Sequence, residues 1–364
     1  MKEIQLTPLK LQAAAKDNEK SARLAELVYV TDKDPGILRR KHGKGFVYYF
    51  DSSKVVNLEE LDRIRKLVIP PAWRDVWICK LPNGHLQATG FDVKGRKQYR
   101  YHPQWSSIRS ETKFYRMYEF GKSLTEIRQQ VRKDLAQPEL NERKVMALLV
   151  RLMDETGIRI GNENYEKENG SYGLTTLKDR HVSIHGNHTI QFFFKGKKGI
   201  QHKITLRNKR LAHMVKQCRD IPGKELFQYY NEKGEIRHVD SGMLNQYIRE
   251  ITTESFSAKD FRTWAGTVHA LSKLKCFDVP VSKTAVKKCM VEALDHVATQ
   301  LGNTRTVCKK YYVHPIIFEW FENAELHHYL KNEDTSSGKT FPLSNDEEVL
   351  IKILERTTSK KALA

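Results

Sequence analysis

Cysteine is scarce in this 364-residue sequence, which has five cysteines and no C-x-x-C pair. The cysteines therefore suggest neither a zinc site nor a disulfide framework, and reduced thiols fit a cytoplasmic protein best. The first twenty residues are too polar for a signal peptide, and no run approaches the roughly 20 apolar residues of a membrane span. We expect a cytoplasmic protein without a membrane segment.

The sequence also lacks the motifs of two common phosphate-handling sites, the P-loop and the metal ion held by acidic residues. The stretch TSSGKT at 335–340 ends like a P-loop, but the first glycine of that motif would fall at Glu333. No acidic cluster has a metal-binding spacing, and Asp32-Lys33-Asp34 is typical of a solvated loop. Any phosphate chemistry in this chain would have to use cationic side chains.

Positive charge is what the sequence has in abundance, with a formal net charge of +19. The first 105 residues carry +8 and the remainder +11. A soluble protein this basic usually binds a polyanion. Because the charge is not confined to a tail, it favours a protein that contacts DNA from two sides, although charge alone equally allows a protein associated with RNA or the ribosome.

The pattern divides the chain into a polar N-terminal segment at 1–26 and a small strand-rich domain at 27–107. Asn57 has the capping pattern of a short helix that runs through Leu67. A turn is expected at 41–45, and another at Pro82-Asn83-Gly84. The expected strands are LVYV (27–30), GFVYYF (45–50), WICKL (77–81), HLQATGFD (85–92) and QYRYH (98–102).

Residues 108–364 are expected to form a larger, mainly helical domain. The run KVMALLVRLMDETG at 144–157 places its apolar residues on one helical face, and Gly157 is a natural stop. Residues 181–206 predict a three-stranded meander. Two more helices are expected at 284–301, capped by Gly302, and at 346–357. The fold class predicted from these elements is α+β.

Five residues stand where cationic phosphate chemistry could be built. Arg159 follows a strongly periodic helix, Lys197 lies in a hairpin turn, and Arg262 opens a helix, where backbone amides also favour anions. Asn303 follows a helix-ending glycine, and Tyr312 comes nine residues later. Taken singly, each has an ordinary structural interpretation: a surface ion pair, a solvated turn, a cover for a helix end, a helix exit and a core aromatic.

The segments around these residues carry a resemblance that covers nearly the whole chain. The stretches are GFDVKGRKQYRYHP (90–103), IRIGNENYEKENGSYGLTTLKDRHV (158–182), FKGK (194–197), KDFRTWAG (259–266) and LGNTRTVCKKYYVHP (301–315). In their order and spacing they resemble the small type IB DNA topoisomerases of bacteria and poxviruses. The resemblance implies an enzyme that cuts one strand of duplex DNA with a tyrosine, lets the duplex rotate and reseals it without ATP, metal or other cofactor.

The resemblance also implies roles and a shape. Arg159, Lys197 and Arg262 would be the catalytic arginine, lysine and arginine, and Tyr312 the nucleophile, since the family pattern puts it directly before VHP. Asn303 would stand where poxviral members carry histidine. The chain would act as a monomer on double-stranded DNA at the nucleoid. The implied architecture is a β-rich N-terminal domain and a mainly helical catalytic domain with a three-stranded sheet, closing as a C-shaped clamp.

The strand expected near residue 99 has the features of a DNA-contacting element. Alternation puts Lys97, Tyr99 and Tyr101 on one face and Gln98 and Arg100 on the other. Such a strand can enter a major groove, where glutamine reads adenine and aromatics contact thymine methyls. The alternative is a half-buried strand with solvated basic residues.

Some choices stay open, and the pattern has departures. Lys198 is next to Lys197 and could be the general acid in its place, and Tyr311 is next to Tyr312. Arg305 stands where the family usually has proline, which could alter the turn before the tyrosine. Tyr311 replaces a small residue.

Two other functions share parts of this pattern. A tyrosine recombinase would usually show H-x-x-R where this chain has Lys259-Asp-Phe-Arg262. The strand-rich N-terminal domain expected in this chain also argues against that class. A non-catalytic DNA clamp would show binding that weakens steeply with salt but no covalent adduct.

Overall fold

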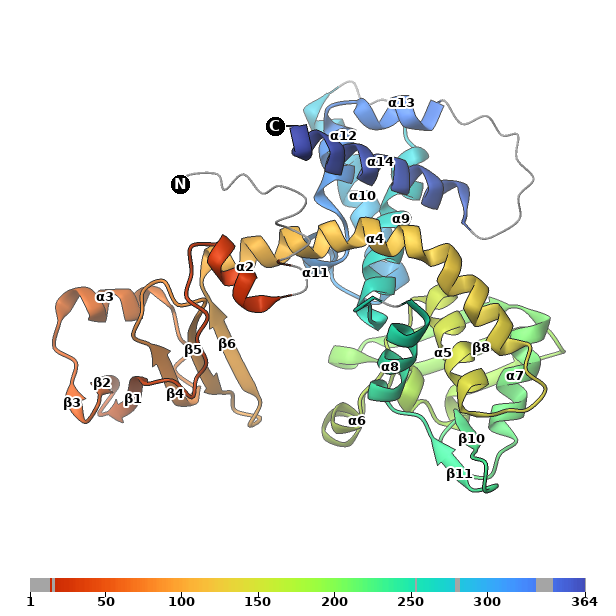
Figure 1. The fold of residues 1–364 in the computed structure, drawn as a ribbon, viewed down its shortest axis with the longest axis horizontal. Helices are drawn as coiled ribbons and strands as arrows, with labels where there is room; N and C mark the ends of the chain where they lie inside the picture. The colour runs from red at the N-terminus through yellow and green to blue at the C-terminus, as the bar shows by residue number, and fades with distance from the viewer. Residues whose placement is uncertain (1–13, 15–16, 253, 279–281, 332–342, 364) are drawn as a thin grey trace. The chain divides into compact units, whose positions relative to one another are not determined.

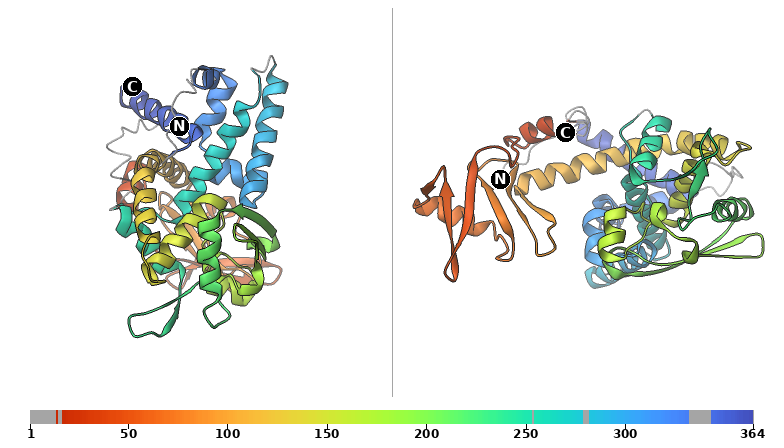
Figure 2. Two further views of the ribbon diagram at one scale, coloured as in Figure 1. Left: turned by 90° about the vertical axis from the view of Figure 1, so that its right-hand side faces the viewer. Right: turned by 90° about the horizontal axis from the view of Figure 1, so that it is seen from below.

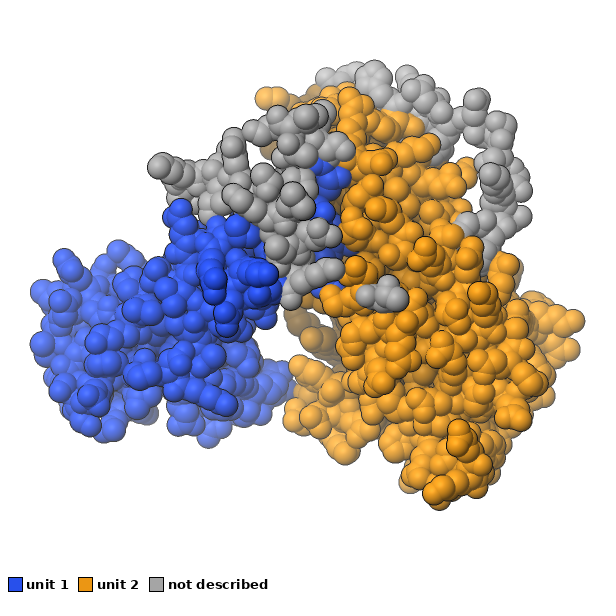
Figure 3. Space-filling model, in the orientation of Figure 1, with its two compact units in different colours: residues 1–116, 357–364 blue, residues 117–356 orange. Residues whose placement is uncertain are grey.

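The computed structural model describes residues 14, 17–252, 254–278, 282–331 and 343–363. The chain forms two compact units, shown in Figure 3. The N-terminal unit comprises residues 1–116 with 357–364, and the C-terminal unit comprises residues 117–356. The P-loop-like stretch at 335–340 lies outside the described residues.

In the described part of the N-terminal unit, six strands form one antiparallel sheet of order β3-β2-β1-β4-β5-β6. Figures 1 and 2 show α3 lying along one side of this sheet. The elements are α2 (Asn18–Leu24), β1 (Gly36–His42), β2 (Gly45–Phe50), β3 (Ser53–Lys54), α3 (Leu58–Lys66), β4 (Arg74–Cys79), β5 (Leu86–Phe91) and β6 (Lys97–Tyr101).

The core of this unit forms where α3 packs on the sheet. Ile64 of α3 is buried against Ile37, Val76 and Ile78. The Asn57 side chain accepts a hydrogen bond from the third residue of α3, which confirms the predicted cap. Burying these side chains removes apolar surface from water, and that is the main stabilising term for so small a sheet.

Two expectations for this unit were wrong. Residues 27–30 are not a strand, since the only pairing there is a single bridge between Val28 and Gly84. Strand β1 was missed because only Ile37 in it is buried and its later residues are exposed Arg, Lys and His, which leaves no apolar alternation to read. The polar segment at 1–26 contains the short helix α2, and Ala22 and Ala25 at its end are fully buried.

The C-terminal unit is mainly helical and contains the predicted meander as a three-stranded antiparallel sheet, β7-β8-β9. The long helix α4 (Pro103–Leu135) begins in the N-terminal unit, and both the division at 116 and the predicted boundary at 107 fall within it. The helices, strands and 3-10 turns up to residue 207 are α5 (Glu142–Thr156), α6 (Glu163–Asn169), η1 (Leu174–Thr176), η2 (Asp179–His181), β7 (Val182–His185), β8 (Thr189–Lys195), η3 (Lys197–Gly199) and β9 (Gln201–Arg207).

The rest of the described part of this unit consists of helices and one small hairpin, β10-β11; residues 357–363 of the last helix belong to the N-terminal unit. These elements are α7 (Lys209–Arg219), β10 (Gln228–Tyr230), β11 (Ile236–His238), α8 (Ser241–Thr252), α9 (Ala258–Lys275), α10 (Lys283–Leu301), α11 (Arg305–Tyr311), α12 (Pro315–Glu322), α13 (Glu325–Lys331) and α14 (Asn345–Leu363). The predicted α+β class, with a β-rich N-terminal part and a mainly helical remainder, is confirmed.

Helices α5 and α9 form the centre of the C-terminal unit. Helix α5 is buried on all sides from 144 to 150, which goes beyond the single apolar face predicted from its sequence, and it ends at Gly157 in the left-handed conformation with φ 62°. Helix α9 contacts α5, α8, α10 and α12, and it runs beside α10 in Figures 1 and 2. Because both helices are enclosed by others, the residues at their ends are held in fixed positions.

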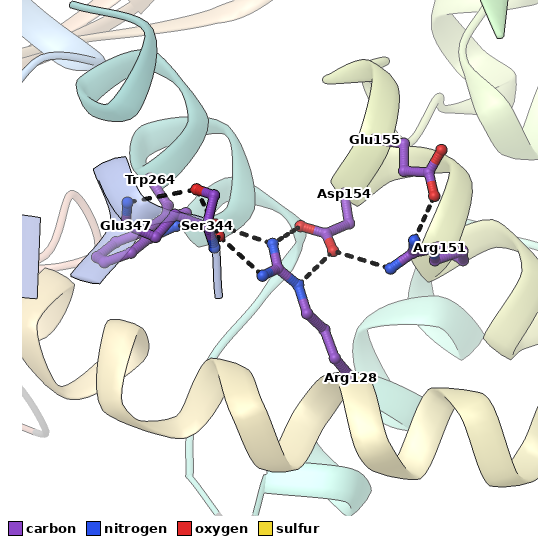
Figure 4. A network of polar contacts seen from close by, with 7 residues as sticks. All are labelled: Arg128, Arg151, Asp154, Glu155, Trp264, Ser344 and Glu347. Atoms are coloured by element: carbon purple, nitrogen blue, oxygen red, sulfur yellow. Dashed lines mark hydrogen bonds and ion pairs between the residues drawn. The ribbon is translucent and has the colours of Figure 1, made fainter. Parts of the chain in front are cut away.

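A buried ion-pair network ties α14 to this centre (Figure 4). Arg128 of α4 donates two hydrogen bonds to Asp154 of α5 and two to Glu347 of α14. Glu347 also accepts from the Trp264 indole of α9 at 2.9 Å. Burial lowers the pKa of Arg128, but the two carboxylates more than offset this and raise it above its ordinary value. The network therefore links four helices through one guanidinium.

Replacing Arg128 with methionine should destabilise the C-terminal unit by about 3–5 kcal/mol, because it leaves two buried carboxylates without their cation. Urea unfolding of both proteins at pH 7 measures the difference. Lys122→Met removes an exposed cation from the same helix and should change the free energy of unfolding by less than about 1 kcal/mol. Equal effects of the two substitutions would contradict this account.

Candidate active site

The backbone of Arg159 is fixed by a segment that comes back to it from residues 173–175. The Leu174 amide donates to the Arg159 carbonyl at 2.8 Å, and the Thr175 amide donates to the Ile160 carbonyl at 2.6 Å. A side chain at Gly173 would lie 2.6 Å from the Arg159 carbonyl oxygen, so only glycine permits this approach. The arginine therefore leaves the end of α5 in a defined direction.

The Arg159 guanidinium meets the end of α10. Its Nη2 donates to the Asn303 side-chain oxygen at 2.6 Å, and both terminal nitrogens lie 3.4–3.5 Å from the Gly302 carbonyl oxygen. Gly302 ends α10 with φ 56°, as predicted for a helix-capping glycine. The Asn303 amide group donates to the Leu301 carbonyl at 3.4 Å, which leaves one of its two protons for another acceptor.

Arg262 lies in the second turn of α9 and is only 5% exposed. The expectation that it opens the helix beside free amides was wrong, because α9 begins four residues earlier at Ala258. Its terminal nitrogens donate to the Gly157 carbonyl and, at 2.9 Å, to the Leu301 carbonyl. Its Nε is buried and has no hydrogen-bond partner among the described residues.

The two arginines share the carboxyl ends of α5 and α10. Carbonyl groups at a helix C-terminus carry partial negative charge, so they stabilise cations placed against them. This compensation is incomplete for Arg262: burial first, and then the charge of Arg159, lower its pKa to about 10. A guanidinium in this state gains stability from any anion that reaches it.

Tyr312 lies directly after α11, beside Arg262. The guanidinium carbon of Arg262 lies 5.1 Å from the centre of the tyrosine ring. Burial raises the pKa of Tyr312, but the neighbouring Arg262 guanidinium, and then the charges of Arg159 and Lys259, more than offset this and lower it below the ordinary value. Tyr311 is 47% exposed at the end of α11, with the Lys310 ammonium over its ring.

The backbone of Tyr312 is seated directly on α9. Thr267 donates its hydroxyl to the Tyr312 carbonyl at 3.2 Å. A side chain at Gly266 would lie 2.6 Å from that carbonyl oxygen and 3.0 Å from the tyrosine Cβ. The glycine of the RTWAG stretch therefore lets the tyrosine approach the helix that carries Arg262.

Lys197 is the one predicted catalytic residue that makes no described contact with Arg159, Arg262, Asn303 or Tyr312. It is exposed at the first position of the β8–β9 turn, and its ammonium lies 5.5 Å from the centre of the Tyr165 ring of α6. Lys198 has a left-handed backbone with φ 63°, which is uncommon for a residue with a side chain. Both lysines extend from a turn at the end of two well-paired strands.

Sequence reasoning missed three residues of this site. His202 of β9 is buried near both arginines, and the signal for it was a histidine on the inward face of a strand that alternates in burial. Lys259 precedes Arg262 by one helical turn, and its charge acts on Tyr312. Thr267 orients the tyrosine backbone, and no local pattern marked it.

The proposed DNA-contacting residues of β6 lie in the N-terminal unit. Tyr99 and Tyr101 stack with ring centres 6.0 Å apart, so they share a face as expected, and both are nearly half exposed. Lys97 pairs with Asp32. Gln98 donates to the Asp92 carboxylate at 3.1 Å and Arg100 to the Val68 carbonyl at 2.9 Å, so both polar side chains of the other face have partners within the unit.

The departure at Arg305 has a structural account. Arg305 is the first residue of α11, a position where proline is favoured because its missing N–H has no helical partner there. Its guanidinium forms two hydrogen bonds of 2.7 Å with Asp295 of α10. The arginine therefore connects the two helices that flank Asn303, where proline would only preset the backbone.

Among the described residues, no group of three or more His, Cys, Asp or Glu residues lies together in a way that could hold a metal ion. None of the helices described has both the length and the apolar character needed to cross a membrane.

The chain is similar to known proteins over most of its length. Residues 102–333 match the catalytic core of eukaryotic DNA topoisomerase I, and residues 45–92 match the N-terminal domain of bacterial DNA topoisomerase IB. DNA topoisomerase 1B of Acanthamoeba polyphaga mimivirus is 36% identical over 298 residues, which are 79% of this chain and 88% of that protein. DNA topoisomerase 1B of Vaccinia virus (strain Copenhagen) is 24% identical over 237 residues, which are 63% of this chain and 70% of that viral protein.

The lowered pKa of His202 predicts an acid-sensitive fold. Burial, followed by the charges of Arg159 and Arg262, lowers this pKa from 6.5 to about 4. Between these values the unfolded chain binds a proton that the folded chain does not, so stability falls as pH decreases through this window and is unaffected above it. The loss attributable to His202 is about 3 kcal/mol between pH 7 and pH 4.

Urea unfolding at pH 7 and pH 4.5, on the natural protein and on His202→Phe, measures this contribution. The phenylalanine variant cannot titrate, so its free energy of unfolding should depend less on pH. Other buried histidines and the carboxylates contribute equally to both proteins and cancel in the comparison. Parallel pH curves for the two proteins would show that His202 is not kept neutral by the fold.

Proposed function

This chain belongs to the type IB DNA topoisomerases, and from that premise we propose that Tyr312 is the nucleophile with which it cuts one strand of duplex DNA. The overall activity is relaxation of supercoiled DNA by transient single-strand cleavage, rotation and religation. The observation that supports the nucleophile best is the Arg262 guanidinium, 5.1 Å from the Tyr312 ring, with a buried Nε that has no partner among the described residues.

The chemistry follows from the charges around the tyrosine. A phenol has an ordinary pKa near 10, and the neighbouring cations stabilise its phenolate. The Tyr312 oxygen attacks phosphorus, the phenolic proton leaves to water, and the bond from phosphorus to the 5′ oxygen breaks. The product is a 3′-phosphotyrosyl strand and a free 5′ hydroxyl. Because the new ester retains the energy of the old one, resealing needs no ATP.

Arg159 and Arg262 would stabilise the phosphate as charge builds on its non-bridging oxygens. Their planar, permanently charged groups offer forked N–H donors that match such oxygens. Asn303 orients Arg159 through its side-chain oxygen and has one amide proton left to donate. Losing one preorganised donor of this kind costs roughly 2.7–4 kcal/mol of transition-state stabilisation.

Lys197 would protonate the departing 5′ oxygen. An alkoxide is a poor leaving group, and a lysine ammonium can supply the proton as the bond breaks. Since the ammonium lies over Tyr165 in the free protein, the turn would have to move when DNA binds. The exposed β6 tyrosines are the proposed contacts to bases, and one chain is proposed to act alone as a monomer.

The first test is plasmid relaxation in EDTA without ATP, run beside a denaturing gel for covalent adducts. The natural protein should relax DNA and form an adduct, while Tyr312→Phe should do neither and still bind DNA. Tyr311→Phe is the matched control and should retain both activities, because its side chain is 47% exposed and has the Lys310 ammonium over its ring. Relaxation by Tyr312→Phe would exclude this tyrosine as the nucleophile, and binding without any adduct by the natural protein would indicate a non-catalytic clamp.

A second test concerns the general acid. Lys197→Ala should slow cleavage of ordinary DNA by about 100-fold or more, the usual contribution of a positioned acid. DNA with sulfur at the 5′ bridging position should restore the rate, because a thiolate leaves without a proton. Lys198→Ala is the matched control. If the sulfur substrate rescues Lys198→Ala and not Lys197→Ala, the neighbouring lysine is the acid.

A further inference from the structure

His202 lies against two turns that carry residues of the proposed site. Its ring stacks on Phe194 of β8 with centres 4.9 Å apart and planes within 10°. One neighbour is Gly196, where a side chain would lie 2.6 Å from His202 Cδ2 and Nε2. The other is Gly302, where a side chain would lie 2.8 Å from the same Nε2 and still closer to Cε1. The ring therefore fills the space that two glycines leave.

Each of these glycines directly precedes a residue of the proposed mechanism. Gly196 precedes Lys197 in the β8–β9 turn, and Gly302 precedes Asn303 after α10. The Gly196 amide also donates to the Ile200 carbonyl at 2.7 Å, which closes the turn onto the strand that carries His202. The position of the turn relative to the end of α10 consequently depends on the ring that both Gly196 and Gly302 contact.

The surroundings suit a flat, neutral ring. His202 is 9% exposed, and the charges acting on it are those of Arg159 and Arg262. A protonated imidazole here would add a third positive charge beside two buried guanidinium groups. The pKa of His202 is accordingly low, about 4, which keeps the ring neutral at physiological pH. A neutral imidazole also leaves the arginines free to meet the phosphate.

We propose that His202 is a positioning residue whose ring sets the distance between the Lys197 turn and the Asn303 turn. This inference rests on the proposed function, since it is Lys197 as general acid that the ring would place. His202 makes no contact with the reacting atoms in this account; it acts through the turn. Without the ring the Lys197 turn is no longer held at a fixed distance from the Asn303 turn, so the lysine no longer reaches one defined position when the turn moves onto DNA.

The experiment is single-turnover cleavage of matched DNAs with oxygen or sulfur at the 5′ bridging position. His202→Ala should slow cleavage of the oxygen substrate by about 10- to 100-fold, the usual effect of a misplacement near 1 Å. It should slow the sulfur substrate by less than about 3-fold, because that substrate needs no acid. His202→Phe keeps a flat ring on Phe194 and should cleave the oxygen substrate faster than His202→Ala.

A reciprocal variant approaches the same space from the other side. Gly196 has φ −91°, a backbone that alanine adopts readily, so Gly196→Ala adds only a methyl group against the ring. It should show the same oxygen-specific defect. The double variant Gly196→Ala/His202→Ala should cleave the oxygen substrate faster than either single variant, because the methyl group occupies part of the space of the lost ring. Gly196→Ala and the double variant test whether the His202 ring sets the distance between the two turns even if His202→Ala alone folds poorly.

The control is His181→Ala, which removes a histidine of nearly equal burial just before β7 of the same sheet. It should affect the two substrates equally. Equal slowing of both substrates by His202→Ala, or additive defects in the double variant, would overturn the inference. If the sulfur substrate rescues Lys197→Ala and does not rescue His202→Ala, the positioning role of His202 is overturned while the role of Lys197 as general acid stands. Rescue of His202→Ala without rescue of Lys197→Ala would overturn the role of Lys197 and keep the turn as the element that His202 places.

Discussion

The site depends on placing two like-charged guanidinium groups close together inside the protein. Left alone, Arg159 and Arg262 would repel each other and lose their hydration, which is costly for buried charges. The carbonyl groups that end α5 and α10 offset this cost, since Gly157, Leu301 and Gly302 all accept hydrogen bonds from the pair. The lowered pKa of Arg262 shows that the offset is incomplete. The remaining deficit is what a phosphate can satisfy.

This requirement explains why the site lies where helices end. A helix C-terminus supplies several unsatisfied carbonyl groups in one direction, and two such ends meet here. Left-handed glycines at 157 and 302 turn the chain away, so the carbonyls remain available to the arginines. The Arg128 network contributes indirectly: it ties α4, α5, α9 and α14 together and so holds the helices that present these ends.

Close approach of backbones is the second constraint. Gly266 lets Tyr312 rest on α9, Gly173 lets the returning chain reach Arg159, and Gly196 and Gly302 accommodate His202. At each of these positions a methyl group would meet another part of the site within about 3 Å. The positions of the functional residues therefore depend on the glycines packed beside them. The departure at Arg305 is compatible with it, since that side chain pairs with Asp295 on the outside of the α10–α11 corner.

The sequence by itself determined the local elements and the types of residue available for chemistry. Periodicity marked α5, and strand-forming runs separated by turn residues marked β7 to β9. Asn57, Gly157 and Gly302 cap helices as their local patterns predicted, because such signals depend on neighbours within a few residues. Strand β1 escaped because its side chains are mostly charged and exposed.

Only the tertiary structure decided which residues meet. It buried Arg262 in the second turn of α9, turned the Asn303 oxygen toward Arg159, placed His202 against two glycines and left Lys197 over Tyr165. The hydrogen bond from Arg159 to Asn303 spans 144 positions, and that from Arg262 to Gly157 spans 105. Contacts of that range follow from how helices pack around one core, and no local pattern in the chain encodes them.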